Sequence, residues 1–143
     1  MFEPGKRKSI DLLVEEFWKL GYMTLSRKFG TYLPEPTRVG DFDVDIIARL
    51  KKSYAIGITL TDEDLNDPLL VGKLNFLATR HTKFTNKRVM LLIGIPKDNY
   101  KHLRALTDKL PHEVKKNLKI FQLQEKEIIS SRHQRDRGKV LFS

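Results

Sequence analysis

The sequence predicts an α/β domain in which a mixed central sheet is flanked by helices, in the element order α-β-β-β-α-β-α-β. Three observations indicate this class. Apolar residues recur at helical spacing in three segments, short segments rich in β-branched and aromatic residues lie between them, and residues 89–95 form an almost unbroken apolar run. Such a run is typical of a strand that is covered on both faces. At 143 residues, the chain has the common size of one domain with its own core.

The first element is expected to be a helix. Ser9 can cap it, and the apolar residues that follow lie on one helical face as far as Gly21, where the helix is expected to end. Residues 22–29 have the β-branched, aromatic and alternating character of a first strand. Gly30 and two prolines then predict a loop, which leads into an acidic segment.

A hairpin and a second helix are expected next. Residues 42–49 alternate between apolar and polar side chains and predict the second strand. The short polar link at 51–53 joins this strand to residues 54–60, so the two strands are expected to pair as a hairpin. Asp67 and Pro68 have the character of the N-cap and first residue of a second long helix.

The last third of the predicted domain contains two strands and a helix. The apolar run at 89–95 predicts a strand in the middle of the sheet, and a third helix is expected from about residue 98. Residues 118–123 predict the last strand, so the single domain is expected to span residues 1–123. Residues 124–143 have many basic and few apolar side chains, which predicts a basic C-terminal tail or arm.

The charge of the chain points to a polyanionic partner. Twenty-seven Lys and Arg stand against eighteen Asp and Glu, which gives a formal net charge of +9 and a pI near 9.8. A field of this sign attracts phosphate backbones, so nucleic acid is the expected partner. Charge of this kind can also serve solubility or ion-pair networks alone, and that alternative stays open at this point.

The absence of cysteine excludes disulfides, thiolate zinc sites and a cysteine nucleophile. The four histidines form no zinc-type pair, and the chain has no phosphate-binding glycine loop and no serine-nucleophile motif. No signal-peptide pattern and no run long enough to span a membrane is present. A cytoplasmic protein without a membrane partner is therefore expected.

The segment from Gly40 to Asp45 is the main candidate for a functional site. Asp41, Asp43 and Asp45 recur at every second position, so an extended chain would present their carboxylates on one face. Hard divalent cations bind such groups, and a bound Mg2+ can promote phosphodiester hydrolysis. Asp41 is better explained as a turn residue. Asp45 precedes an apolar run, where a carboxylate is costly unless it is paired or binds metal.

Three features together resemble a known family. The first helix ending in Gly21, the run from Asp43 to Arg49 and the hairpin into residues 54–59 resemble the PD-(D/E)xK nuclease superfamily, especially archaeal Holliday-junction resolvases and related restriction-endonuclease-like proteins. The resemblance covers about residues 8–123 and implies a restriction-endonuclease-like fold. It also implies a DNA endonuclease of resolvase type that uses Mg2+ or Mn2+, with Asp45 as the metal-binding Asp of the second strand.

The third strand departs from that family. In the family, an acid and a Lys two residues apart on this strand complete the site, and here these positions fall on Gly57 and Thr59. An inactive DNA-binding or protein-interaction module on the same fold, without a cofactor, is therefore the alternative to a nuclease. A basic RNA-associated domain is a third, weaker hypothesis.

Other residues are candidates to replace the missing groups. Asp62 or Glu63 could supply the acid, Lys73 the ammonium group, and Asp11 a further ligand. Glu63 and Asp64 are better explained as an acidic helix N-terminus, and Lys73 fits a solvated helix face equally well. The candidate catalytic residues are Asp45, Asp43 and Lys73. The candidate metal ligands are Asp45, Asp43, Asp11 and Asp62.

Duplex or branched DNA is the expected ligand, because the sequence lacks the interleaved aromatic residues of single-strand binders. A homodimer is expected from the resemblance. Basic side chains on the leader, near the acidic segment and in the tail are the candidate phosphate contacts. They are Lys6, Arg7, Lys8, Arg27, Lys28, Arg38, Arg132, Arg135 and Arg137.

Overall fold

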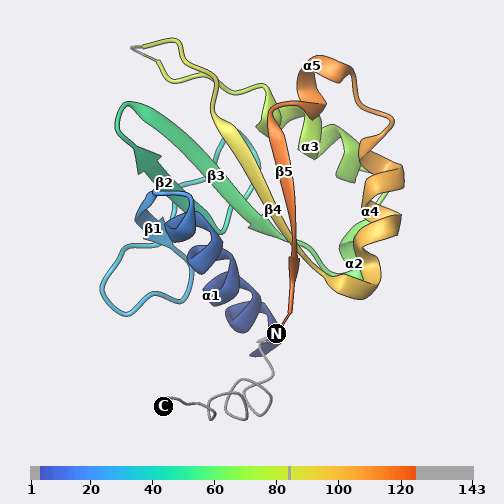
Figure 1. Ribbon diagram of the computed structural model, residues 1–143, viewed down its shortest axis with the longest axis horizontal. Coiled ribbons are helices and arrows are strands. Elements are labelled where there is room, and N and C mark those ends of the chain that lie inside the picture. Colours follow the sequence, from blue (N-terminus) through green and yellow to red (C-terminus); the bar gives the residue numbers. More distant parts are fainter. Residues whose placement is uncertain (1–3, 84, 125–143) are drawn as a thin grey trace, which may run out of the picture.

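The computed structural model describes residues 4–83 and 85–124, which form a five-stranded mixed sheet with helices on both faces (Figure 1). The strands lie across the sheet in their sequence order. They are β1 (Met23–Arg27), β2 (Ile46–Leu50), β3 (Ser53–Thr59), β4 (Met90–Pro96) and β5 (Leu118–Leu123). The helices are α1 (Pro4–Lys19), α2 (Asp62–Leu65), α3 (Leu70–Ala78), α4 (Tyr100–Thr107) and α5 (His112–Lys115), with a 3-10 turn, η1 (Lys97–Asn99), before α4.

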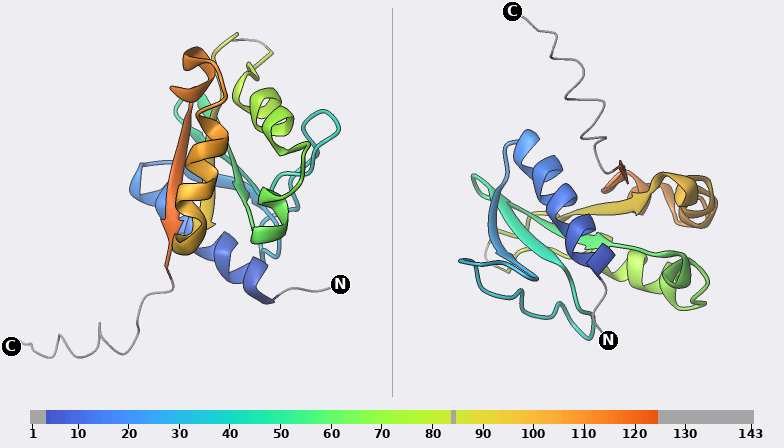
Figure 2. Two further views of the ribbon diagram at one scale, coloured as in Figure 1. Left: turned by 90° about the vertical axis from the view of Figure 1, so that its right-hand side faces the viewer. Right: turned by 90° about the horizontal axis from the view of Figure 1, so that it is seen from below.

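The sheet changes from antiparallel to parallel pairing at β3. The neighbouring strands β1, β2 and β3 are antiparallel, and β3, β4 and β5 are parallel. Parallel neighbours need crossover connections. The helices α2 and α3 connect β3 to β4, and α4 and α5 connect β4 to β5 (Figures 1 and 2). As a result, β3, β4 and β5 all end at one edge of the sheet.

Two hydrophobic clusters fill the space on the two faces of the sheet. On one face, Ile10, Leu13 and Phe17 of α1 are fully buried against the sheet. On the other face, the crossover helices cover the sheet with a larger cluster that contains residues of all four of them. The strand β4 supplies Leu92 to the first cluster and Leu91 to the second, which confirms that its apolar run lies inside the sheet. No helix within residues 4–83 and 85–124 is long and apolar enough to cross a membrane.

Two predicted helix starts are wrong. The helix α1 begins at Pro4, so Ser9 lies inside the helix and does not cap it. Proline suits a first helical position, since its fixed backbone angle is already helical and its missing N–H has no helical partner there. The helix between β3 and β4 is divided in two, and the second part, α3, begins at Leu70. The Asp67 side chain instead accepts a hydrogen bond from Leu69 N in the intervening turn, at 2.9 Å.

The division of this helix has a local cause. Thr61 and Asp64 form a capping box, in which each side chain accepts a hydrogen bond from the other residue's backbone N–H. This box fixes the start of the four-residue helix α2, which ends at Asn66, where the backbone N–H bonds the oxygens of Glu63 and Asp64. The element order therefore contains two helices between β3 and β4, where the sequence predicted one.

The second strand is shorter than predicted. Val39 and Phe42 bridge each other across a tight turn in which Gly40 has a φ of +63°, and β2 begins only at Ile46. Val44 packs into the cluster of the crossover helices, but Ile46 packs against α1. The predicted alternation from 42 to 49 is therefore broken, and the three carboxylates do not lie on one face of an extended strand.

Candidate functional site

Asp45 lies at the head of β2, between the ends of β1 and β3. Its backbone oxygen accepts a hydrogen bond from Lys28 N at 3.0 Å, and its own N–H donates to Gly57 O at 2.9 Å. These bonds continue the sheet pairing on both sides and fix the direction of the side chain. Asp45 is only 3% exposed, so its carboxylate must find its partners within the protein.

The Asp45 carboxylate has four such contacts. Oδ2 accepts hydrogen bonds from Thr59 N at 2.7 Å, from Thr59 Oγ1 at 3.0 Å and from Lys6 Nζ at 3.1 Å. Lys28 Nζ lies 3.7 Å from Oδ1. Lys6 also donates to the backbone oxygen of Thr59, at 3.1 Å. We call Asp45, Thr59, Lys6 and Lys28 the Asp45 centre.

Lys6 is the member of this centre whose role the sequence did not indicate. It was expected only as a phosphate contact in a basic leader, because the helix was expected to begin after it. In the structure it lies in the first turn of α1, and this turn carries its ammonium group to the end of β3. Pro4 at a first helical position was the signal that could have shown this.

The two positions where the resemblance would require an acid and a lysine are both used structurally. At Gly57, a Cβ atom would lie 2.8 Å from Cζ of Phe17 and 3.1 Å from Cβ of Ile46, so the ring of Phe17 fills the space of a side chain. Thr59 uses both its N–H and its hydroxyl group on Asp45. A lysine does approach this point, but it comes from α1.

The other candidate metal ligands and Lys73 have separate partners. Asp11 is bound to Arg27 Nη2 at 2.5 Å, and Asp62 accepts a hydrogen bond from Asn99 at 2.5 Å. The exposed Asp43 pairs with Arg38 at 3.2 Å. Lys73 Nζ lies 6.0 Å from the centre of the Phe42 ring. Asp41 lies in the tight turn, and its backbone oxygen accepts a hydrogen bond from Arg38, in agreement with its assignment to a turn.

The residues around Asp45 do not fit a divalent cation. Magnesium is usually bound by one or two carboxylates together with water and substrate oxygens. Here the carboxylate oxygens face two ammonium groups and two other hydrogen-bond donors. Two unit charges of like sign 4 Å apart repel by about 4 kcal/mol at an effective dielectric constant of about 20, and a doubly charged ion would feel about twice that from each lysine. In this arrangement Lys6 and Lys28 already supply the positive charge.

Two further cations lie beside the centre. Arg7 donates to Phe29 O at 3.1 Å and lies over the Phe29 ring, with 5.6 Å between Cζ and the ring centre. Arg27 is held by Asp11. Like the two lysines of the Asp45 centre, these arginines come from the first turn of α1 and the end of β1. We call Lys6, Arg7, Arg27 and Lys28 the cationic edge.

An open hollow of about 490 Å³ lies next to the cationic edge. Arg7 and Arg27 line it together with Phe29, Tyr32 and Leu33. Tyr32 is 94% exposed, so its ring is available to a ligand in this hollow. The carboxylate of Glu35 accepts a hydrogen bond from Phe29 N and so holds the loop after β1 in place.

The remaining predicted phosphate contacts are distributed differently. Lys8 lies on α1, and Arg38 is in the exposed pair with Asp43. Arg132, Arg135 and Arg137 lie outside the described residues. The strand β5, from which the tail continues, ends at the same edge of the sheet as Thr59, beside the start of α1 (Figure 1).

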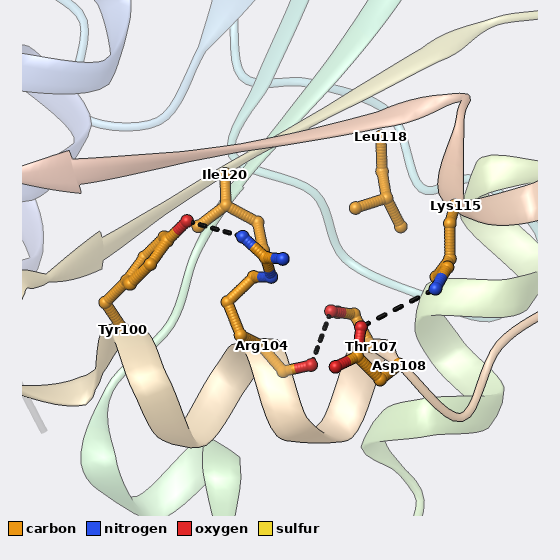
Figure 3. Close-up of a pocket in the computed structure, with 7 residues that line it drawn as sticks. All are labelled: Tyr100, Arg104, Thr107, Asp108, Lys115, Leu118 and Ile120. Carbon is orange, nitrogen blue, oxygen red and sulfur yellow. Dashed lines mark hydrogen bonds and ion pairs between the residues drawn. The ribbon is translucent and has the colours of Figure 1, made fainter.

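A second hollow, of about 230 Å³, lies between α4, α5 and β5 (Figure 3). Its polar side chains bind one another. Arg104 donates to the Tyr100 hydroxyl at 2.8 Å, and Lys115 lies 3.6 Å from Asp108. The hydrogen bond to the Tyr100 hydroxyl also raises the pKa of Arg104. Because these groups satisfy one another, the hollow is a weaker candidate than the cationic edge.

Comparison with known protein families, with curated proteins and with solved structures finds no match for this chain.

Proposed function

We propose that this chain binds the phosphate backbone of DNA through the cationic edge, and that it does so without divalent-metal cleavage. The observation that carries the proposal is the arrangement at Asp45, where two lysines share one buried carboxylate. One carboxylate neutralises one ammonium group, so the centre keeps a net positive charge. Such a centre attracts a phosphate and repels a metal ion.

The partial exposure of the two lysines supports this proposal. The side chains of Lys6 and Lys28 are 25% and 29% exposed, so each ammonium group can reach a ligand at the surface while Asp45 fixes its position. A cation held in place loses less side-chain entropy on binding than a mobile surface lysine does. Arg7 adds a further cation along the adjacent hollow, where Asp11 balances the charge of Arg27.

The fold is consistent with a restriction-endonuclease-like origin, which we include in the proposal. The order of one helix, three antiparallel strands, a helical crossover and a parallel strand is the order that the resemblance implies. On this view Asp45 is retained from a metal site but now positions two lysines. The acid of the third strand has been replaced by close packing of Phe17 on Gly57.

Binding and cleavage assays on the same protein test this proposal. The unmodified chain should bind duplex DNA and a four-way junction, and it should leave both intact in the presence of Mg2+ or Mn2+. The double variant Lys6→Gln/Lys28→Gln should bind about tenfold more weakly, since it removes two phosphate contacts. The matched control Lys101→Gln/Lys109→Gln changes two exposed lysines of the same charge on the other face and should lose much less affinity.

The variant Asp45→Asn distinguishes DNA binding from metal-dependent cleavage. If Asp45 only positions the lysines, its loss removes one negative charge but also releases two ammonium groups from their fixed positions. These effects oppose each other, so the variant should keep a DNA affinity within about tenfold of the unmodified chain. Asp43→Asn, which removes an exposed carboxylate from the same segment, is the control. Metal-dependent nicking that disappears in Asp45→Asn and persists in Asp43→Asn would show that the chain is a nuclease.

A further inference from the structure

A basic β-finger projects from the sheet at the end where β3 and β4 begin (Figure 1). Its two arms are residues 80–83 and 85–88. His81 and Arg88 bridge each other, Thr82 N donates to Lys87 O at 2.9 Å, and Val89 N donates to Arg80 O at 2.9 Å. These bonds make the arms a short antiparallel ribbon.

The base of the finger is attached to α3. The Arg80 guanidinium carbon lies 3.8 Å from the centre of the Phe76 ring, and Arg80 Nε donates to Phe76 O at 2.8 Å. Asn117 Nδ2 bonds the backbone oxygens of Ala78 and Val89, at 2.8 and 2.6 Å. The start of the finger and its return to β4 are therefore both held by the folded domain.

The finger carries positive charge without compensation. Between Asp67 and Asp98 the sequence contains no acidic residue. Lys83 and Lys87 are exposed, and Arg88 is half-buried. Within residues 4–83 and 85–124, none of these three side chains forms an ion pair with a carboxylate. The finger is thus a local cationic surface, separate from the cationic edge.

An open groove of about 480 Å³ lies between the finger and the sheet. Its floor is apolar and includes Ile47, Tyr54 and Ile56, where Ile47 and Ile56 are direct neighbours on β2 and β3. Its rim includes Arg80, His81 and Lys83, and none of the described residues that line it is acidic. A concave, largely apolar surface with a few charged groups at its rim is typical of a site for another molecule.

We infer that this groove binds an amphipathic, acidic segment of a partner protein. Apolar side chains of such a segment would cover the apolar floor, and its carboxylates would pair with the cations of the finger. Complementary charge of this kind also speeds association and discriminates against wrong partners. Nucleic acid fits less well, because Tyr54 is the one Phe, Tyr or Trp among the described residues that line the groove, and the other apolar side chains of the floor offer nothing to phosphates.

This inference is independent of the proposed DNA site. Tyr54 in the groove and Thr59 in the Asp45 centre are five residues apart on β3, which corresponds to roughly 17 Å along an extended strand. At physiological ionic strength this is about two Debye lengths, so charge changes at the finger should have little effect at the cationic edge.

Four labelled probes test the inference on the full chain. The first is an amphipathic helical peptide with Glu on one face and Leu or Phe on the other. In the second, Ser replaces every Leu and Phe, and in the third, Lys replaces every Glu. The fourth is a short DNA duplex. The first peptide should bind measurably by fluorescence anisotropy, and the Ser and Lys peptides should each bind at least about tenfold more weakly, because each lacks one of the two required features.

Charge reversal on the finger locates the site. Lys83→Glu/Lys87→Glu should weaken binding of the first peptide at least about tenfold, whereas Lys101→Glu/Lys109→Glu, with the same change in net charge, should change it less than about twofold. The inference fails if the peptide does not bind or if both pairs weaken it equally. It also fails if the finger pair selectively weakens the duplex and leaves the peptide unaffected, because the finger would then be a nucleic-acid contact.

Discussion

At Gly57, the lack of a side chain allows Phe17 of α1 to pack directly on the middle of β3. The same contact removes the space in which an acid of the third strand would lie. A single residue choice therefore strengthens the core on this face and alters the chemistry of the neighbouring centre.

Gly57→Ala should destabilise the protein by about 1–3 kcal/mol, because its Cβ would overlap the Phe17 ring and the Ile46 side chain. Gly72→Ala is the matched control. Gly72 lies in α3 with no atom within 4 Å of an added Cβ, so alanine should stabilise the helix by up to about 1 kcal/mol. Denaturant unfolding gives both values. Equal effects at the two glycines would contradict the packing described for Phe17.

The stability of the chain should depend on the charge of Asp45. Asp45→Asn keeps the size of the side chain but leaves Lys6 and Lys28 without a counter-charge. Removing one member of a fully buried ion pair costs about 3–5 kcal/mol, and we expect about 1–3 here because both ammonium groups reach water. Asp43→Asn breaks an exposed pair and should change the free energy of unfolding by less than about 1 kcal/mol.

Tyr22 should make the protein less stable in alkali. Its ring packs against Phe17, and burial raises the pKa of its phenol above the usual value of 10.0. The unfolded chain then ionises at a lower pH than the folded chain, so stability is complete below about pH 10 and is lost as the pH rises through the raised value. Tyr22→Phe should therefore flatten the fall in unfolding free energy as the pH rises above about 10. Around pH 8, the free energy of unfolding should depend on pH in the same way in the variant and in the unmodified protein.

Asp45 could be identified from the sequence, but its partners could not. A carboxylate followed by Ile46 and Ile47 has an energetic cost that the sequence alone displays. The position of Lys6 depends on where α1 begins, and that depends on a proline and on tertiary contacts. Asp11 and Asp62 were candidates from chain position only, and in the structure each bonds a nearer partner.

Among the elements, the strands were predicted best. The unbroken run of β4, the hairpin of β2 and β3, and the six residues of β5 all follow from side-chain pattern alone. The boundaries that failed depend on local bonds. The Thr61 and Asp64 box starts α2 ahead of the predicted helix, and the tight turn at Gly40 delays the start of β2.

Asn117 connects α3, β4 and β5 through hydrogen bonds, so its substitution tests how these elements are held together. Asn117 directly precedes β5. Its side chain donates hydrogen bonds to the backbone oxygens of Ala78, which ends α3, and of Val89, which precedes β4. Its own backbone oxygen accepts a hydrogen bond from Leu91 N. Asn117→Ala would leave two buried backbone oxygens without donors and should cost about 2–4 kcal/mol. The rate of backbone amide hydrogen exchange should also rise in the finger. Asn99→Ala, which removes an exposed hydrogen bond, should have little effect, and exchange that rises equally in both variants would argue against this role.

At the scale of the whole molecule, the two groups of cations described above lie at opposite ends of the sheet. The cationic edge lies where β3 and β5 end, and the finger lies where β3 and β4 begin. The net charge of +9 indicated a polyanionic partner but could not show this division, because it arises only when the strands bring distant residues together. The two ends then present different surfaces, one beside a hollow of mixed charged and aromatic lining and one beside a mainly apolar groove.

The dependence of DNA binding on salt tests this arrangement as a whole. Each neutralised phosphate contributes about −0.9 to the slope of log K against log salt, so Arg7→Gln should make the slope shallower by about 1. Removal of residues 125–143, which include Arg132, Arg135 and Arg137, should make it shallower by several units if the tail extends the same surface. Lys101→Gln, on the opposite face of the sheet from α1, should leave the slope unchanged. An affinity that does not fall as salt rises would mean that phosphate contacts do not drive binding, and the cationic edge would then require another ligand.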